Sequence, residues 1–575
     1  MTPRSLACYA ALTAVMLACG ISSGRAQSIR IPSEQAGQEI PGQMPGTPAE
    51  LRPSNDSPVL LAASDAARTS NAPSGRVAPN APSLVRDTSW PPAPQLLAND
   101  NGCSAALTGR GTTYHVGPGQ KYADLQDVPW LSLRAGDVVN IHYRPEPYRS
   151  KIGLRGQGTA DEPIVINGVT DANCQRPVIS GENALTVRDA QQRQFFSKQY
   201  SENLGVFLIY KGPQDAYGYR PAHIHFKNLK ITGGHKDFTY TAQDGSTGRY
   251  SRAAAAIYAV LIEGLVVENC EITRNGNGLF VNSKSGDEPS LGATFRHNRI
   301  WDNGVVDSYY EHNLYVQTQR SLYEGNYIGQ LIPGAAGSSL KDRSSATVVR
   351  FNHIVSAARA LDLVEIEGGV PQILNDPYYH SAWVYGNLIV DEAKNKRAYS
   401  VKLIHWGGDN DPRYFRNGTL WFYNNTVVLK VDKTDFWYVS LFDMPTAQQK
   451  VNLRANIIQN QGSAELRLGY EHGTIDLDDT NLITGSYIPG GVNNTVKINV
   501  IGRVLDTRNP GLDANGRPQR GAPGTDAGKL TPLRMPAGVL TDNLRVSHQF
   551  APPARLVPRS LQGAGPDLGA FELMP

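Results

Sequence analysis

The chain has 575 residues and a formal net charge of only +3, because 55 basic side chains offset 52 acidic ones. The two signs are interleaved along the sequence, which excludes the basic face of a nucleic-acid-binding protein and predicts no nucleic-acid partner. The length is too great for one compact core, so the chain contains either several domains or a repeat that grows along one axis.

Residues 1–26 have the pattern of an export signal. They contain one arginine near the start, a short apolar run, and the small-x-small sequence Gly24-Arg25-Ala26. The apolar run is too short to cross a bilayer and no second run follows, so no transmembrane segment is expected. We expect a periplasmic or secreted protein. Lipoprotein anchoring at Cys19 is less favoured, because Leu17 stands where a small residue is usual.

Residues 27–105 are rich in Pro, Ser, Ala, Asn and Gly and poor in large apolar side chains. Such a segment buries too little apolar surface to offset the entropy cost of ordering. It is interpreted as a disordered tether between the export signal and the folded part of the chain.

The region 106–490 is predicted to form one β-domain, because a short pattern, apolar-x-apolar-x-x-Asn-x-Ile/Val, recurs in it at intervals of 25 to 41 residues. The clear copies are TFRHNRI (294–300), LYEGNYI (322–328), VVRFNHI (348–354), WVYGNLI (383–389), FYNNTVV (422–428), NLRANII (452–458) and DDTNLI (478–483). The alternation is that of short strands that must stack on neighbours to bury their apolar sides. The repeat predicts an all-β fold, a right-handed, single-stranded parallel β-helix with long loop insertions.

The asparagine of each copy has a specific structural interpretation. Asparagine tolerates left-handed backbone and can hydrogen-bond to the equivalent asparagine of the next coil, which predicts an internal ladder. Helical repeats are excluded by the composition of the copies, which are rich in Val, Ile, Tyr, Asn and Gly and lack an i, i+3, i+4, i+7 apolar stripe.

Both ends of such a coil need covering, because open ends expose strand edges and core. Residues 122–133, with apolar positions at Tyr122, Leu125, Val128 and Leu131, predict an amphipathic capping helix at the N-terminal end. Residues 491–575 lose the repeat and predict an irregular tail that packs on the outside or covers the far end.

Three cysteines remain after removal of the export signal. Cys270 falls on the asparagine phase and is expected to point inward as a free thiol. Cys103 and Cys174 lie outside the regular repeats near the first coils, where they either form a disulfide or remain as buried thiols.

Four neighbouring strands carry polar residues at positions expected to face outward. Residues one coil apart in a parallel coil lie about 4.8 Å from each other, so these positions predict one contiguous patch. The outward residues are Asn313 and Tyr315, then Lys341 and Arg343, then Glu365 and Glu367, then either His405 or Trp406. The simpler alternative is a set of solvated ion pairs, each of little energetic value.

Long insertions at 189–203, 235–256, 368–382 and 406–417 carry many aromatic side chains. Long loops in a compact repeat are often functional, and aromatic rings with polar tips suit sugar rings. The alternative is that these aromatic side chains simply pack the loops onto the coil.

The repeat, the export signal and the terminal sequence GPDLGAFE (565–572) resemble the parallel β-helix proteins of the pectate-lyase-like superfamily, many of which are carbohydrate-active. The placement of Lys341 one coil after Asn313 resembles the arrangement in the alginate lyase and chondroitinase B family. That resemblance implies a lysine base and an asparagine that neutralises the uronate carboxylate together with a calcium-bound acidic group. The sequence departs from the family where it has Ala-Gly-Ser-Ser (336–339) before the lysine and no arginine one coil later.

The predicted function is that of an exported polysaccharide lyase, most simply a monomer, that cleaves an acidic, uronate-containing polymer by β-elimination. This chemistry needs a group that neutralises the carboxylate, a base and a proton donor. The expected base is Lys341, Arg343 and Asn313 hold the carboxylate, and Tyr315 or His405 donates the proton. The remaining expected substrate-binding residues are His312, Glu365, Glu367 and Trp406, with calcium as the one cofactor considered, at Glu365 and Glu367.

Three alternatives remain open. Glu365 and Glu367, two residues apart on one strand, could serve as the carboxyl pair of an inverting glycoside hydrolase. C5 epimerisation shares the proton abstraction with elimination. A non-catalytic carbohydrate-binding protein of the cell envelope would need only the aromatic loops.

Overall fold

The computed structural model describes residues 90–97, 102–187, 190–196, 202–284, 288–356, 358–393, 402–529 and 542–573. All of these lie in one compact unit, residues 39–575. The predicted export signal, Cys19 and residues 27–89 of the predicted tether lie outside the described residues. Within the described residues, no helix is both long and apolar enough to span a bilayer.

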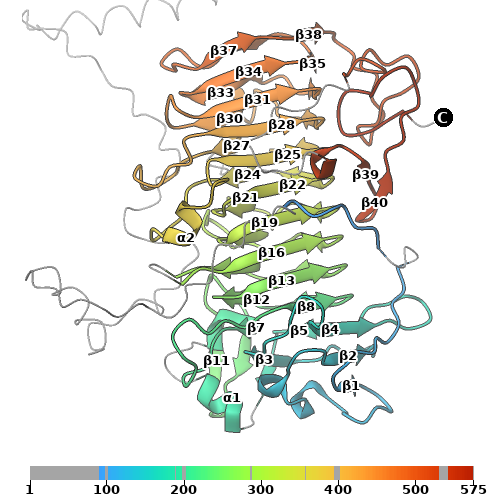
Figure 1. The fold of residues 1–575 in the computed structure, drawn as a ribbon, viewed down its shortest axis with the longest axis vertical. Helices are drawn as coiled ribbons and strands as arrows, with labels where there is room; N and C mark the ends of the chain where they lie inside the picture. Colours follow the sequence, from blue (N-terminus) through green and yellow to red (C-terminus); the bar gives the residue numbers. More distant parts are fainter. Residues whose placement is uncertain are drawn as a thin grey trace, which may run out of the picture. The chain divides into compact units, whose positions relative to one another are not determined.

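The described chain forms a parallel β-helix. From β12 to β38, each coil places one strand in a 14-stranded sheet, the next in a 13-stranded sheet and the third in an 11-stranded sheet, and every pair between successive coils is parallel (Figure 1). Sheet order therefore follows sequence order from β12 onward, which confirms the predicted architecture.

The strands have the following bounds. The 13-stranded sheet contains β1 (Thr113–Val116), β2 (Val138–His142), β4 (Ile164–Val169), β8 (Ile224–Lys227), β13 (Glu263–Glu268), β16 (Leu291–Arg296), β19 (Gln319–Glu324), β22 (Thr347–Arg350), β25 (Ser381–Tyr385), β28 (Thr419–Tyr423), β31 (Lys450–Arg454), β34 (Thr474–Asp478) and β37 (Lys497–Val500). The 14-stranded sheet contains β11 (Thr247–Arg249), β10 (Thr239–Thr241), β6 (Ala184–Thr186), β3 (Ser150–Leu154), β7 (Gly205–Ile209), β12 (Ala255–Val260), β15 (Asn277–Asn282), β18 (Leu314–Val316), β21 (Ser338–Asp342), β24 (Arg359–Leu363), β27 (Lys402–Trp406), β30 (Tyr438–Met444), β33 (Glu465–Glu471) and β36 (Tyr487–Ile488). The 11-stranded sheet contains β5 (Val178–Ser180), β9 (Lys230–Thr232), β14 (Glu271–Thr273), β17 (Arg299–Ile300), β20 (Tyr327–Ile328), β23 (His353–Ser356), β26 (Leu388–Asp391), β29 (Thr426–Leu429), β32 (Ile457–Asn460), β35 (Thr480–Ile483) and β38 (Arg503–Asp506).

The core is built by the alternation seen in the sequence. In β13, Leu265 and Val267 are buried inside the coil while Val266 and Glu268 between and after them face outward. The same phase in successive coils gives one continuous apolar core from Val116 to Ile483.

The asparagine of each repeat forms the expected ladder. We call this set the asparagine column; it comprises Asn298, Asn326, Asn352, Asn387, Asn425, Asn456 and Asn481. The backbone N–H and side-chain Nδ2 of each member donate to Oδ1 of the next, as from Asn352 to Asn387 at 2.9 and 3.0 Å. The left-handed backbone falls one residue earlier than predicted in six of the seven, for example at His297, Gly325 and Phe351. The ladder therefore confirms the prediction, but the strained residue precedes the asparagine.

The predicted capping helix over 122–133 is not confirmed. This segment contains two separate 3-10 turns, η2 (Leu125–Asp127) and η3 (Trp130–Ser132), with Pro129 between them. Asp124 caps the first turn and its partner Asp127 closes a capping box, so the turn ends where the proline begins the second. Leu125, Val128 and Trp130 nevertheless enter the main core.

The terminal segments pack on the outside of the coil. Trp90, inside the predicted tether, is buried, and its Nε1 donates to the Ala346 carbonyl, so the ordered chain begins before residue 106. Strands β37 and β38 extend the coil past residue 490. The remaining tail contains η5 (Asp542–Leu544) and the hairpin β39 (His548–Ala551) and β40 (Arg555–Pro558), and its Phe550 and Phe571 cover Leu388 and Val428 of the 11-stranded sheet.

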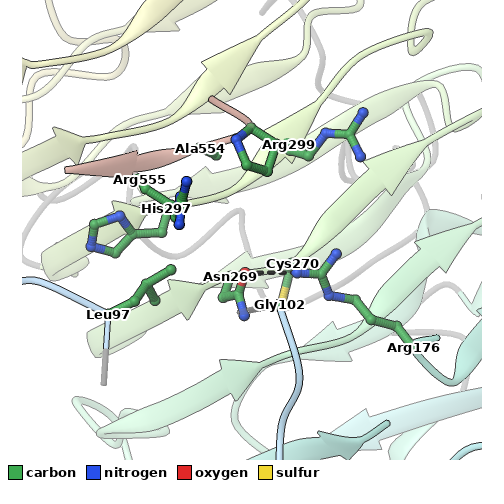
Figure 2. Close-up of a pocket in the computed structure, with 10 residues that line it drawn as sticks. Leu97, Gly102, Arg176, Asn269, Cys270, His297, Arg299, Ala554 and Arg555 are labelled. Carbon is green, nitrogen blue, oxygen red and sulfur yellow. Dashed lines mark hydrogen bonds between the residues drawn. The ribbon is translucent and has the colours of Figure 1, made fainter. Parts of the chain in front are cut away.

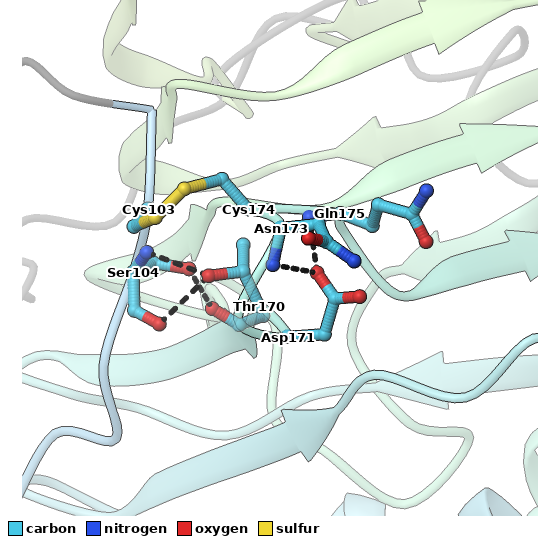
Figure 3. The surroundings of a disulfide bond; sticks show 8 residues. Cys103, Ser104, Thr170, Asp171, Asn173, Cys174 and Gln175 are labelled. Atoms are coloured by element: carbon cyan, nitrogen blue, oxygen red, sulfur yellow. Dashed lines mark hydrogen bonds between the residues drawn. A yellow bond between two sulfur atoms is a disulfide. The ribbon is translucent and has the colours of Figure 1, made fainter.

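Cys103 and Cys174 form a disulfide with Cα atoms 4.4 Å apart (Figure 3). Ser104 beside it donates to the Gly168 carbonyl and to Thr170 Oγ1, so the bond joins the N-terminal segment to the turn between β4 and β5. The closed loop spans 71 residues, for which the loss of chain entropy gives about 4 kcal/mol. Cys270 is free, and burial raises the pKa of its thiol to about 12.

Candidate active site

One series of side chains runs along the outer face of the 14-stranded sheet, one per coil and in register. We call it the outer column; it comprises Tyr258, Phe280, Tyr315, Lys341, Asp362, His405, Asp443 and Tyr470. Side chains that face inward flank this position on the strands, for example Leu340 before Lys341 and Ile404 before His405. The column begins aromatic and becomes charged along the coil.

The aromatic end of the column is closed to solvent. The rings of Tyr258, Phe280 and Tyr315 stack with centroids 4.3 and 4.9 Å apart. Phe195 and Phe196, at and just after the end of α1 (Ala190–Phe195), belong to the same buried cluster. Tyr315 donates its hydroxyl to Glu367 at 3.3 Å. The insertion therefore packs against the sheet here instead of opening a sugar-binding surface.

Other aromatic side chains of the insertions behave in the same way. Tyr240 and Tyr250 form a small buried cluster with Phe238, and Tyr379 packs with Tyr414 against the loop after β24. For these residues the packing interpretation holds.

The charged end of the column is a chain of alternating charges. Lys341 Nζ lies 3.0 Å from Asp362 Oδ2, and Asp362 Oδ1 lies 2.9 Å from His405 Nδ1. His405 Nε2 in turn lies 4.0 Å from Asp443 Oδ2. The four groups occupy four successive coils, so the imidazole stands between two carboxylates.

Two cations flank this histidine. Arg359 reaches Asp362 at 3.2 Å and Asp443 at 3.5 Å, and Lys402 reaches Asp443 at 3.4 Å. Arg359 is 18% exposed and His405 is 9% exposed, whereas Lys341 is only 2% exposed. His405 is therefore buried but less so than Lys341, and Arg359 beside it is the flanking cation that solvent reaches.

The predicted partner of Lys341 changes with the register. Asp362, not Glu365, pairs with Lys341 across the strands, because β24 ends at Leu363 and the two glutamates follow it. Both glutamates still approach Arg343: Glu367 Oε1 lies 3.2 Å from Nη2, and the Glu365 carbonyl accepts from Nη1 at 2.8 Å. Tyr315, Lys341, Arg343, Glu365 and Glu367 thus do meet, but under a covering loop.

Two predicted substrate-binding residues face the wrong way. Asn313 precedes β18 and is buried; it accepts from Asn303 at 2.9 Å and donates to the Gly329 carbonyl at 2.7 Å, so it supports a turn. Trp406 is in the apolar core, because His405 occupies the outward position of β27. The expectation that Asn313 faces outward is wrong, and the choice between His405 and Trp406 falls to His405.

His312 and Asp342 are buried polar residues near the column. His312 Nδ1 accepts from the Ser338 N–H at 2.9 Å, so Nε2 carries the hydrogen, and it has no hydrogen-bond partner among the described residues. Asp342 points inward, as its phase predicts, and accepts from Ser321, Tyr323 and Thr347 at 2.7, 2.7 and 2.6 Å. Asp342 therefore joins neighbouring sheets and does not orient Lys341.

The carboxyl groups at the charged end differ in the direction of their pKa shifts. Burial disfavours ionisation of Asp362, but Lys341 and Arg359 outweigh it and hold its pKa well below the usual range. Burial, assisted by the nearby charge of Asp443, raises the pKa of Glu471, the residue after Tyr470. An ionised Asp362 and a more readily protonated Glu471 therefore lie on opposite sides of His405.

Sequence reasoning missed Arg359, Lys402, Asp409 and Asp443. Asp443 follows His405 by one coil at the same phase, in the segment LFDM, so extending the register by one strand would have found it. Arg359 and Lys402 are the first residues of β24 and β27. The sequence pattern did not define where these strands begin, so it could not place the two residues. Asp409 belongs to an insertion, where no phase exists to predict it.

Comparison with known proteins adds the following. No protein-family model matches the sequence, and no curated protein is significantly similar. Solved structures with a similar coil include an alginate lyase from a Paenibacillus species (12% identity, 59% of this chain and 92% of that chain, TM-score 0.30) and a pectate lyase (11%, 80% and 96%, 0.34). A DFA-IIIase from Arthrobacter chlorophenolicus matches at 12% identity over 70% and 87% of the two chains, with a TM-score of 0.29. At these values no residue role is transferred, and the fold rests on the strand register above.

The residues proposed for calcium do not fit that ion. Glu365 Oε1 accepts from the backbone N–H groups of Asn410 and Asp411 at 2.6 and 2.9 Å, and both glutamates lie against the Arg343 guanidinium. Among the described residues no three His, Cys, Asp or Glu side chains are grouped to hold a metal. We therefore derive no step through a metal.

Two hollows lie away from the column. One, of about 190 Å³, is enclosed between the coil and the terminal segments and is lined by Arg176, His297, Arg299 and Arg555 among others (Figure 2). The other, of about 580 Å³, lies at the corner between β32 and β33. Trp437, 69% exposed, and Tyr487 line it together with hydroxyl and amide side chains, so it combines an aromatic face with polar groups.

Proposed function

We propose that this protein is a carbohydrate-active enzyme that cleaves a uronate-containing polysaccharide by β-elimination at the charged end of the outer column. The observation that carries the proposal is the position of His405, between the carboxylates of Asp362 and Asp443 and beside the cations Arg359 and Lys402. The imidazole is held at Nδ1, and its Nε2, 4.0 Å from Asp443 Oδ2, makes no hydrogen bond to that carboxylate.

The base in this proposal is His405, not Lys341. Two carboxylates, Asp362 and Asp409, lie within 3.0 Å of the Lys341 ammonium, and opposite charges at that distance favour the protonated form. A protonated amine cannot accept the C5 proton. Nδ1 of His405 lies 2.9 Å from both Asp362 Oδ1 and Arg359 Nη1. In this proposal Nδ1 carries the hydrogen and donates to Asp362, and Arg359 is bound by the carboxylates instead. Nε2 is then left as the acceptor, the arrangement in which a carboxylate orients an imidazole base.

In this reaction one side chain, His405, carries out both proton transfers. His405 Nε2 takes the C5 proton, the C5–H electron pair forms the C4–C5 double bond, and the C4–O bond breaks. The imidazolium returns its proton to the leaving oxygen, which restores the base. Arg359 and Lys402 stabilise the negative charge that develops at the uronate carboxylate, for which preorganised cations in a partly dry site are suited.

Hydrolysis is the second candidate, favoured by one observation. The raised pKa of Glu471 suits a general acid, while Asp443 or Asp362 could activate water as the base. Asp362 and Asp443 are two strands apart, about 9.6 Å between Cα atoms, but the His405 imidazole and the Arg359 guanidinium lie between them, so Glu471 and Asp443 are the pair to test. Glu365 and Glu367, the pair first considered, are less suitable because Arg343 and the covering loop occupy them.

In the proposal, the hollow beside β33 is a second sugar-binding surface next to the outer column. The strand carries Tyr470 of the column at one end and Glu465 of the hollow at the other, about 17 Å apart along the chain. Trp437 would stack on a sugar several units from the bond that breaks, because its exposed face lies beside polar groups.

The test is an incubation of purified protein with a panel of acidic and neutral polysaccharides. Elimination gives ultraviolet absorbance from the unsaturated uronate together with new reducing ends. New reducing ends without absorbance would establish hydrolysis, exchange of the C5 hydrogen without cleavage would establish epimerisation, and binding without any reaction would identify a non-catalytic carbohydrate-binding protein.

A further inference from the structure

The loop after β27 places a carboxylate between two buried cations. Asp409 Oδ2 lies 2.9 Å from Lys341 Nζ and 2.8 Å from Arg343 Nη2. Lys341 and Arg343, which we call the cation pair, project from β21 and its end, and both are almost fully buried. One oxygen of the loop therefore contacts both cations, each of which also has a carboxylate partner near the sheet: Asp362 for Lys341 at 3.0 Å and Glu367 for Arg343 at 3.2 Å.

Backbone hydrogen bonds hold this loop closed. The N–H groups of Asn410 and Asp411 both donate to Glu365 Oε1. The loop leaves the strand through Gly407, whose φ of +102° is accessible to glycine and costly for other residues. The following residues from Asn410 to Arg413 lie at the surface. Just beyond this stretch the loop is anchored again, because the Tyr379 hydroxyl donates to the Tyr414 carbonyl at 2.6 Å.

A third buried group faces this region without a partner. His312 carries its hydrogen on Nε2, which has no acceptor among the described residues. Burial, together with the charge of Lys341, lowers the pKa of His312 to about 3. A neutral donor beside a cation pair has the composition of a site for one carboxylate and one hydroxyl.

We propose that Lys341 and Arg343 form a carboxylate-binding site which Asp409 fills when the loop 407–413 is closed, and which a uronate carboxylate of the substrate fills when the loop opens. The exchange is electrostatically neutral, because one carboxylate replaces another and the buried cations stay paired. The inference rests on the proposed function for the identity of the ligand, and it adds a second carboxylate subsite beside the one at Arg359 and Lys402.

The first experiment is chemical rescue of Asp409→Ala, followed by thermal unfolding of the full chain. Loss of the carboxylate removes one counter-ion from each of two buried cations, while Lys341 keeps Asp362 and Arg343 keeps Glu367, so Tm is expected to fall by about 2 °C or more. Sodium acetate is expected to restore most of that loss along a saturable curve, whereas sodium chloride at equal ionic strength does not. Asp411→Ala is the matched control, because its carboxylate pairs with Arg413 at the surface and acetate should leave its Tm unchanged.

A second variant decides the matter if Asp409→Ala does not fold. Asp409→Asn keeps the side-chain volume and removes the competing charge, so galacturonate is expected to bind it at least tenfold more tightly than wild type by calorimetry. Equal affinity in the two proteins, or a Tm of Asp409→Ala that acetate does not raise above chloride, would overturn the inference. Acetate rescue in a protein that degrades no polysaccharide would leave this site standing and reject the proposed function.

Discussion

Two columns of polar side chains run along the same coil, and they differ in what repeats. In the asparagine column every member is the same residue and makes the same bonds to the next, as Asn352 does to Asn387. In the outer column the positions are equally regular, but the residue changes from Tyr315 to Lys341 to Asp362 to His405.

The difference separates structural from functional polar groups. A ladder of identical amides satisfies every buried donor with the next coil and needs no ligand. Opposite charges at unequal spacing, beside a partly exposed Arg359, have no such internal requirement on the outer face of a sheet. Uniformity along a coil therefore indicates structure, and variation at a fixed phase indicates a site.

The strongest expected effect is on His405 in the outer column. His405→Gln removes the proposed base, and turnover of the polysaccharide that wild type cleaves should fall by about 100- to 10,000-fold. Tm should stay near that of wild type, because the glutamine amide can donate to Asp362 in place of the imidazole. His472→Gln, a partly exposed histidine two coils on, is the control and should remain active. A fully active His405→Gln would remove the proposed base.

Asp391 is a buried carboxyl group that belongs to neither column, and its ionisation should destabilise the fold. Burial raises its pKa to about 7, and neither carboxylate oxygen has a side-chain or backbone hydrogen-bond partner among the described residues by geometry. Because the folded pKa exceeds the unfolded value near 3.9, stability should decrease as pH rises from about 4 to about 7. Asp391→Asn should therefore gain about 4 kcal/mol at pH 8 and nothing at pH 3. Denaturant titrations at both pH values measure this, and an equal change at both would contradict it.

Within the asparagine column, Asn387→Ala should destabilise without affecting chemistry. The Asn387 side chain donates to Val349, Tyr385 and Asn425 and accepts from Asn352. Truncation leaves several buried groups unpaired, at a cost of about 3 kcal/mol or more. Turnover per folded molecule should be unchanged. The control is the exposed Asn499→Ala, which should leave the denaturation midpoint unchanged. A catalytic defect in Asn387→Ala would contradict a purely structural role for the asparagine column.

Trp437 tests how far the functional surface extends. Trp437→Ala should raise KM for long polymers about tenfold, the equivalent of about 1.4 kcal/mol, while kcat for short oligosaccharides stays the same. Tyr217→Ala, an equally exposed aromatic residue near the first coils, is the control. KM is measured on substrates of increasing length. Equal KM values in both variants would show that Trp437 binds no part of the substrate.

The smallest expected effect is a gain. The backbone N–H of Cys270 already donates to Asn298, so this cysteine occupies the position one coil before the asparagine column. Cys270→Asn should extend the column by one member and stabilise the protein by about 1 kcal/mol. Urea denaturation measures the change; a loss of stability would show that the thiol's apolar packing matters more than the added hydrogen bonds.

The sequence predicted the coil and the asparagine ladder because both depend on local, repeated chemistry. Lys341, Arg343 and His405 were placed on the correct strands for the same reason. The prediction failed at Asn313, which precedes the first residue of β18, and at Glu365, which follows the last residue of β24, so neither side chain has the facing that strand alternation predicts. Asp409 could not be predicted, because its partners are set by the conformation of an insertion that follows no repeat.

The most direct test of the outer column as the active site is a crystal structure of His405→Gln with an oligosaccharide of the polymer that wild type degrades. We expect a sugar over residue 405, with its carboxylate within hydrogen-bond distance of Arg359 or Lys402. An oligosaccharide bound to another sheet, with no contact to the outer column, would contradict the account.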